Sequence, residues 1–191
     1  MKKPDREMNI HSELIELCRR GDSKAQFELY NLYSRAMYNV SCRFLPDRME
    51  AEDAMQEAFF KAFDKLHTFR NEVAFGAWLK RIVVNTCIDY LKKKKLQLTS
   101  IDDVKGVADV QDGADDFVPE SVEDIKLAMN ELPEGYRLVL NLHLVEGYEY
   151  EEIAEMLGIA QSSVRSQFTR ARQKLIELLK QRNKTFNYGK V

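Results

Sequence analysis

"YEEIAEMLGIAQSSVRSQFTRARQKL", residues 150–175, is the stretch that decides the fold. Its apolar residues recur at helical spacing up to Leu157, and Gly158-Ile159 then interrupts the pattern. The spacing resumes along one face of a second helix at Val164, Phe168, Ala171 and Leu175. Two short helices joined by a tight glycine turn are typical of a helix-turn-helix motif.

The outward face of the second helix carries side chains suited to nucleic acid. Arginine fits guanine edges and phosphates, and hydroxyl and amide groups make adaptable contacts with bases. We expect Ser162 to cap this helix, so that free N–H groups there lie near a phosphate. The candidate DNA contacts are Ser162, Ser163, Arg165, Ser166, Thr169, Arg170, Arg172 and Lys174. A helical hairpin that only packs against the rest of the chain is the alternative interpretation.

The charges of the chain are arranged in blocks. The 191 residues carry a formal net charge of −2, with 45% hydrophobic and 31% charged residues, as in a soluble globular protein. Residues 80–95 and 163–184 are basic, whereas residues 100–124, "SIDDVKGVADVQDGADDFVPESVED", are strongly acidic. This partition favours two functional modules with an acidic connector between them.

Several classes of protein do not fit this sequence. No apolar run approaches the roughly 18 residues that span a bilayer, and the basic start has no apolar segment behind it. We therefore expect a cytoplasmic protein without membrane insertion. Cys18, Cys42 and Cys87 are widely spaced, which argues against a disulfide framework or a zinc site and favours buried thiols. We expect no metal and no cofactor.

Nearly every periodic segment has helical spacing, which predicts an all-α fold of two helical domains. The first domain, residues 10–95, contains about four helices. Asp47, with Glu50 three residues later, predicts an N-cap and its acidic partner. Residues 96–121 lose the periodicity and read as a flexible acidic linker. Residues 122–182 form the second domain.

Two further features lie in the first domain. The break at residues 67–73, "HTFRNEV", leaves Phe69, Arg70 and Asn71 where side chains can reach solvent, and aromatic rings next to cations suit unstacked bases. Phe75 and Trp78 fall on the apolar stripe and are predicted to be core. Before the break, a helix carries a polar face with Glu52, Asp53, Gln56 and Glu57.

The carboxylates of that polar face admit an enzymatic interpretation, as general acids or metal ligands. No His or Cys stands at ligand spacing, and the sequence contains no glycine-rich phosphate loop or nucleophile motif. A solvated face or a protein-docking face is the better interpretation.

These three features, in this order, resemble the extracytoplasmic-function (ECF) group of the bacterial sigma-70 family of RNA polymerase initiation factors. The strings that carry the resemblance are "EDAMQEAFFKAF" (52–63), "AFGAWLKRIVVNTCIDYLKKKK" (74–95) and "LPEGYRLVLNLHLVEGYEYEEIAEMLGIAQSSVRSQFTRARQKL" (132–175). The resemblance covers the chain from about Leu14 to Leu179. One departure is Glu149, where the family often has Ser or Thr; a carboxylate at this helix end still favours the helix dipole, but a phosphate contact there is not carried over.

The resemblance implies a sigma2 domain at residues 10–95 and a sigma4 domain at residues 122–182. The four polar residues from Glu52 to Glu57 would dock on the coiled coil of the polymerase β′ clamp. The loop from Thr68 to Val73 would capture an unpaired base of the −10 element, with Phe69, Arg70, Asn71, Arg81 and Asn85 as its DNA-binding residues. The second helix of the helix-turn-helix would enter the major groove at the −35 element.

The resemblance also implies partners and a role. The partners would be core RNA polymerase, through its β′ clamp and β flap, promoter DNA, and an anti-sigma factor, which no single residue demonstrates. The protein would be a transcription initiation factor and not an enzyme. A stand-alone helix-turn-helix regulator is the alternative, but it leaves the acidic helix and the aromatic and basic loop without a role.

Overall fold

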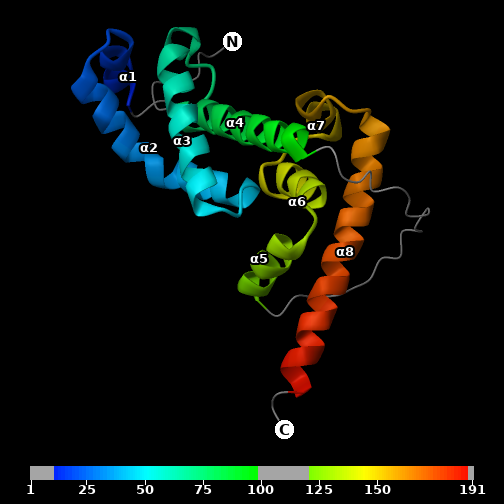
Figure 1. The fold of residues 1–191 in the computed structure, drawn as a ribbon. Helices are drawn as coiled ribbons and strands as arrows, with labels where there is room; N and C mark the ends of the chain where they lie inside the picture. Colours follow the sequence, from blue (N-terminus) through cyan, green and yellow to red (C-terminus); the bar gives the residue numbers. More distant parts are fainter. Residues whose placement is uncertain (1–10, 99–120, 189–191) are drawn as a thin grey trace, which may run out of the picture. The chain divides into compact units, whose positions relative to one another are not determined.

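The computed structural model describes residues 11–98 and 121–188, with side chains to residue 94 in the first range and to residue 182 in the second. Every regular element within these ranges is a helix, and the chain divides into two compact units, residues 1–101 and 102–191 (Figure 1). The predicted all-α fold with two helical regions is confirmed. Most of the predicted linker, residues 99–120, lies outside the described residues.

Four α-helices and one short 3₁₀ turn build the first unit. They are α1 (Ser12–Arg19), α2 (Ser23–Phe44), α3 (Arg48–Asp64), η1 (Leu66–Thr68) and α4 (Phe75–Leu98). Asp22 begins α2 by accepting hydrogen bonds from the backbone N–H groups of Lys24 and Ala25 at 2.9 Å each. A carboxylate in this position satisfies N–H groups that have no partner inside the helix.

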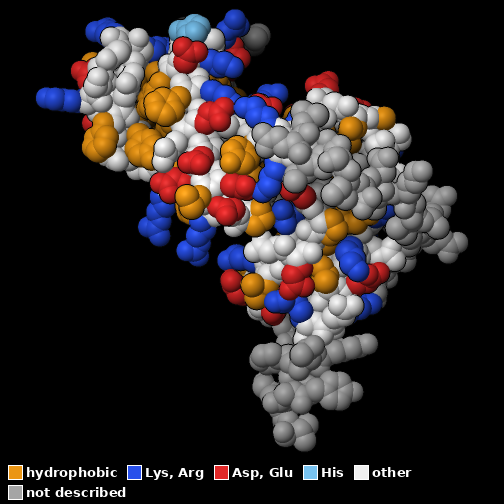
Figure 2. All heavy atoms as spheres, in the orientation of Figure 1, with side chains coloured by type: hydrophobic (Ala, Val, Ile, Leu, Met, Phe, Trp, Pro, Cys, Tyr) orange, Lys and Arg blue, Asp and Glu red, His pale blue; other side chains and the backbone are white. Residues whose placement is uncertain are grey.

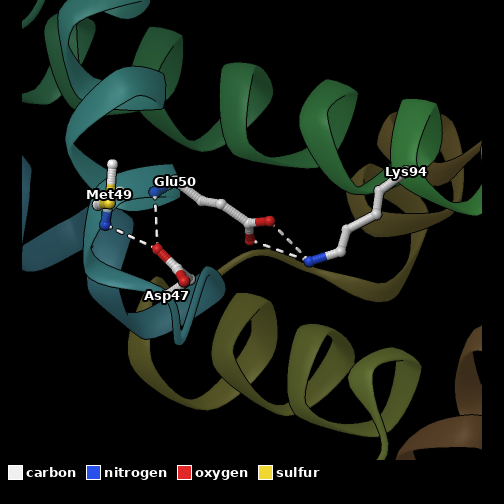
Figure 3. Close-up of polar contacts among 4 residues, drawn as sticks. All are labelled: Asp47, Met49, Glu50 and Lys94. Atoms are coloured by element: carbon white, nitrogen blue, oxygen red, sulfur yellow. Dashed lines mark hydrogen bonds and ion pairs between the residues drawn. The ribbon is translucent and has the colours of Figure 1, made fainter.

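The start of α3 confirms one half of the predicted cap and corrects the other. The Asp47 carboxylate accepts from the backbone N–H groups of Met49 and Glu50, at 2.8 and 3.1 Å, as expected of an N-cap (Figure 3). The Glu50 side chain, predicted as the reciprocal partner of Asp47, instead accepts from Lys94 Nζ at 2.7 and 3.1 Å. The sequence spacing could not reveal this ion pair, because Lys94 lies 44 residues away.

A stripe of alanines forms the inner face of α3. Ala51, Ala54, Ala58 and Ala62 are all buried, and Leu79, Val83 and Cys87 of α4 are buried within the same unit. Small side chains let two helices approach closely and fill the space between them at high density. Burial raises the pKa of the Cys87 thiol to about 11, so this cysteine remains a protonated, apolar side chain at neutral pH.

The second unit contains α5 (Val122–Glu131), α6 (Glu134–Leu140), a π-helical turn η2 (Asn141–Val145), α7 (Tyr150–Leu157) and α8 (Gln161–Tyr188). Its core joins Leu132, Leu140 and Ala171, with Phe168 and Leu175 packed against them. The predicted apolar face of the helix from residue 162 onward therefore lies inward, as the spacing indicated.

The turn between α7 and α8 has the geometry that the sequence indicated. Gly158 takes a positive φ of 71°, which glycine adopts without steric cost. The N–H groups of Gly158 and Ile159 both donate to the Ala154 carbonyl, at 2.8 and 3.1 Å. The prediction that Ser162 caps α8 is wrong, because the helix begins at Gln161 and the Ala160 carbonyl accepts its first hydrogen bonds.

None of the helices in the described ranges is both long enough and apolar enough to span a bilayer.

Candidate functional site

The outer face of α3 is polar at its centre and apolar near its ends. Glu52, Asp53 and Gln56 are exposed, and Gln56 Nε2 donates to Glu52 Oε1 at 3.3 Å. Met49 and Phe60, on the same helix, are 77% and 75% exposed. Figure 2 shows acidic side chains with apolar ones among them over the part of the surface that α3 occupies in Figure 1. A face of this composition is suited to a protein partner with basic and apolar groups.

The third carboxylate predicted on this face, Glu57, is engaged within the unit. Its side chain pairs with Lys61 Nζ at 2.8 Å, and the hydrogen bond from Lys61 holds the pKa of Glu57 below its usual value. Lys61 also approaches the Thr86 hydroxyl at 3.4 Å and Asp89 at 3.9 Å, both on α4. Glu57 is therefore less available to a partner than Glu52 and Asp53.

The loop between η1 and α4 corrects one predicted site residue. Phe69 was expected to reach solvent, but its side chain is only 3% exposed. Its ring lies 5.5 Å from the Phe75 ring and 5.2 Å from the Trp78 ring, measured between centroids. The ring is apolar and finds aromatic neighbours below the loop, so it anchors the loop and is not open to stacking on a base.

The residues that follow Phe69 are exposed, as predicted. Arg70 and Asn71 both lie on the surface, and Asn71 is the one non-glycine residue in the described ranges with a positive φ, at 59°. Asparagine tolerates this left-handed backbone better than most residues do. The loop therefore turns sharply at Asn71, directly after the buried anchor.

Two further predicted residues share one face of α4. Arg81 and Asn85 are exposed and lie four positions apart, which places them on neighbouring turns of the helix. Asn85 immediately precedes Thr86, whose buried hydroxyl donates to the Ile82 carbonyl at 2.9 Å. Arg81 and Asn85 thus extend outward from a helix whose other faces are packed.

The predicted residues of α8 differ in solvent exposure and in the contacts that their side chains make. Ser162, Ser163, Arg165, Ser166 and Arg172 are exposed, whereas Thr169 and Arg170 are half-buried. Within this set, the Ser166 hydroxyl donates to the Ser162 carbonyl at 3.0 Å, and Lys174 pairs with Glu177 at 3.1 Å. Among the predicted cations, Arg170 is half-buried and Lys174 is exposed but paired with Glu177, whereas Arg165 and Arg172 are exposed.

Sequence reasoning missed an aromatic cluster under the start of α8. The His143 ring stacks on Tyr150 with centroids 4.4 Å apart and meets Phe168 edge-on at 4.9 Å. The Arg165 guanidinium lies over the Tyr150 ring, 5.9 Å from its centroid, within the range of a cation–π interaction. Tyr150 therefore restrains an arginine that the sequence alone presents as free.

Two other features were not predicted. At the start of α7, the Glu149 backbone N–H donates to the Glu152 carboxylate at 2.9 Å, which is half of a capping box formed entirely by acidic residues. In the first unit, the Arg19 side chain donates to the Leu66 and Phe69 carbonyls, directly below the loop. The only sequence signal for Arg19 is its position beside Gly21-Asp22, which marks a helix end and not a long-range contact.

The surfaces described above carry exposed charged and polar side chains on three helices and one loop. No cluster of three His, Cys, Asp or Glu side chains that could hold a metal ion occurs within the described ranges. The exposed groups are an acidic helix face, a constrained loop beside Arg81 and Asn85, and a helix with cationic and hydroxyl side chains.

Comparison with known proteins identifies two family segments. Residues 29–97 match the family model of sigma-70 region 2, and residues 123–175 match that of sigma-70 region 4. The RNA polymerase sigma-H factor of Pseudomonas aeruginosa is 32% identical over 180 residues, which cover 87% of this chain and 92% of that protein. The ECF RNA polymerase sigma-E factor of Escherichia coli K12 is 30% identical over 84% of this chain and 89% of its own length.

One solved structure supports the same similarity. It is the sigma factor RpoE in complex with the anti-sigma factor NepR from Bartonella quintana, which is 27% identical to this chain. The match has a TM-score of 0.51 and covers 80% of this chain and 95% of that one.

The positive φ of Asn71 leads to a prediction about the loop. Asn71→Gly should lower the free energy of unfolding by less than Asn71→Val does, because glycine adopts this backbone freely. Asn71→Val should lower it by about 1–2 kcal/mol, since a β-branched residue is strained in the left-handed region. Urea denaturation followed by circular dichroism measures both, with Glu72→Val as the control at the next exposed position. Equal losses for the two valine variants would contradict the prediction.

Proposed function

The chain belongs to the ECF group of the sigma-70 family of RNA polymerase sigma factors, and on this premise we propose that it binds core RNA polymerase and directs it to promoters. The observation that carries the proposal is the occurrence of region 2 and region 4 in one chain, in the order of the relatives that it matches over most of their length. A stand-alone helix-turn-helix regulator would need only the second unit. It would leave the constrained loop and acidic helix of the first unit unused.

The outer face of α3 is the proposed docking surface for the β′ clamp. Glu52, Asp53 and Gln56 are exposed and would meet basic groups of the polymerase, while Met49 and Phe60 would add apolar contact area. Glu57 contributes less in this proposal, because its carboxylate already pairs with Lys61. The second unit would contact the β flap.

The loop after η1 and the exposed face of α4 are the proposed reading surface for the −10 element. Arg70 and Asn71 would hold a base that has left the DNA stack, with Arg81 and Asn85 beside them. Unstacking a base costs a few kcal/mol, and a preformed pocket offsets part of that cost. Phe69 would support this loop from beneath, since its ring is buried against Phe75 and Trp78.

The exposed face of α8 is the proposed reader of the −35 element. Arg165, Ser166, Thr169 and Arg170 would face base edges in the major groove. Ser162, Ser163, Arg172 and Lys174 would contact phosphates. The pairing of Lys174 with Glu177 weakens its contribution, so that Arg172 is the stronger phosphate contact of the two. In this scheme α8 positions the complex on duplex DNA.

The proposed role is that of a binding factor and not of an enzyme. Binding energy from two DNA elements would favour the open promoter complex, with polymerase holding both units at high effective concentration. The protein would act in the cytoplasm, where polymerase meets the chromosome. An anti-sigma factor is a further proposed partner, because the similar Bartonella quintana sigma factor is bound to one.

Run-off transcription over a genomic library tests the function directly. Core polymerase with this chain should initiate from a small set of promoters that core polymerase alone does not use. The start sites would reveal the −35 and −10 sequences. Absence of initiation from every fragment would sink the proposal, provided that a known sigma factor supports initiation with the same core preparation.

Charge reversal on α3 should break the contact with polymerase. The double variant Glu52→Lys, Asp53→Lys should lower the affinity for core polymerase by about 10-fold or more, because like charges would then face each other. Co-purification with tagged core polymerase measures this loss. Glu13→Lys, an exposed charge reversal on α1 of the same unit, is the control and should bind as the wild type does. Undiminished binding of the double variant would count against the assignment of this face.

Substitution of Arg165, a proposed base contact, and of Arg172, a proposed phosphate contact, should impair DNA binding in different ways. Arg165→Ala should cost about 1–3 kcal/mol at one base pair of the −35 element and relax the preference there. Arg172→Ala should weaken binding by a similar factor for every sequence, since a phosphate contact carries no base information. Holoenzyme binding to duplexes with single base-pair changes separates the two cases. Uniform weakening by Arg165→Ala would rule out base reading by this side chain.

A further inference from the structure

The last residue of α1 extends across the first unit to the base of the loop. Arg19 Nε donates to the Leu66 carbonyl at 3.2 Å, and Nη2 donates to the Phe69 carbonyl. Nη1 pairs with Glu16 one turn earlier on α1, and the Arg19 side chain is only 23% exposed. One guanidinium thus connects α1 to two carbonyls that lie 47 and 50 residues further along the chain.

The Leu66 carbonyl belongs to the first residue of η1, and the Phe69 carbonyl belongs to the residue that follows η1. The Leu66 carbonyl accepts a hydrogen bond from the Phe69 backbone N–H at 3.2 Å, and Arg19 Nε adds a second donor to the same oxygen. The planar guanidinium presents several donors in a fixed arrangement, so it can hold two neighbouring carbonyls at once. A lysine in its place would offer a single nitrogen to both.

The hydrogen bond from Arg19 to the Phe69 carbonyl fixes the direction in which the loop leaves the core. The Phe69 ring is fixed from the other side by Phe75 and Trp78, so both the main chain and the side chain of this residue are held. Arg70 and Asn71 follow at once, and Asn71 turns the chain with its positive φ. The position of these two exposed side chains therefore depends on Arg19.

We propose that Arg19 is a positioning residue for −10 recognition, acting through the backbone of residues 66–69. The proposal rests on the proposed function, because it concerns the loop assigned above to the unpaired base. Arg19 lies before residue 29, where the match to sigma-70 region 2 begins, so the family segment does not include it. A loop held in advance loses less conformational freedom when it captures a base, which favours binding and discrimination.

The experiment compares Arg19→Gln with Arg20→Gln in the full chain bound to core polymerase. Arg20 is the next residue and is exposed, so Arg20→Gln removes the same charge but keeps the hydrogen bonds from Arg19 to Leu66 and Phe69. The probe is a fork-junction DNA with an unpaired −10 strand, carrying either the base found by run-off transcription or each of the other three bases. Arg19→Gln should reduce the preference for the correct base by about 10-fold, the scale of losing hydrogen bonds from a charged donor.

Two other measurements should not change. Affinity for core polymerase and for a duplex −35 element should stay within about 2-fold of the wild type, because the hydrogen bonds of Arg19 go to Glu16, Leu66 and Phe69, which belong neither to the outer face of α3 nor to the second unit. Arg20→Gln should match the wild type in all three assays. Arg19→Lys, which keeps one donor nitrogen, should give an intermediate preference.

Amide hydrogen exchange provides a readout that needs no DNA. In Arg19→Gln the peptide covering residues 66–74 should exchange faster, while peptides of α3 and α8 keep wild-type rates. An unchanged base preference, unchanged exchange in this peptide, or an equal loss of affinity for all four bases would overturn the proposal. Failure of the wild type to prefer any base would instead overturn the proposed role of the loop itself, and the role of Arg19 in recognition with it.

Discussion

The packing of α3, through its buried alanine stripe, against its neighbours α2 and α4 is the constraint on which the first unit depends. Because α3 turns its small residues inward, its carboxylates and its exposed Met49 and Phe60 must face outward. Ion pairs fix the same two helices at separate points, with Glu50 to Lys94 at the start of α3 and Lys61 to Asp89 further along. One helix pair therefore determines both the acidic face and the direction of Arg81 and Asn85.

In each unit, an arginine side chain donates hydrogen bonds to carbonyl groups next to a short helical segment. In the first unit Arg19 holds the carbonyls around η1, and in the second the buried Arg137 donates to the Asn130 and Leu132 carbonyls at 3.3 Å each, at the end of α5. Charged donors make stronger hydrogen bonds than neutral ones and can satisfy two acceptors together. Each arginine thus fixes a turn whose own sequence is too short to fold alone.

Periodicity was sufficient to predict the helices and the helix-turn-helix, because burial of one helix face repeats at a known interval. It also identified exposed residues on α3 and α8, although Glu57, Thr169 and Arg170 are half-buried, whereas Arg81 and Asn85 of α4 were predicted from the family resemblance. It failed where a contact joins distant segments: Glu50 with Lys94, Arg19 with Phe69, and His143 with Tyr150 and Phe168. Phe69 shows why a break in periodicity does not imply exposure. A loop residue can be the anchor of the loop when an aromatic neighbour lies beneath it.

The pairing of Lys94 with Glu50 has a consequence for how the run "KKKK" acts electrostatically. A polyanion is bound partly through release of its condensed counterions, and the slope of affinity against salt concentration scales with the phosphates that are neutralised. Lys94 is already neutralised by a carboxylate of its own unit (Figure 3). In the proposed complex with promoter DNA, this run would therefore displace fewer ions than its four lysines suggest.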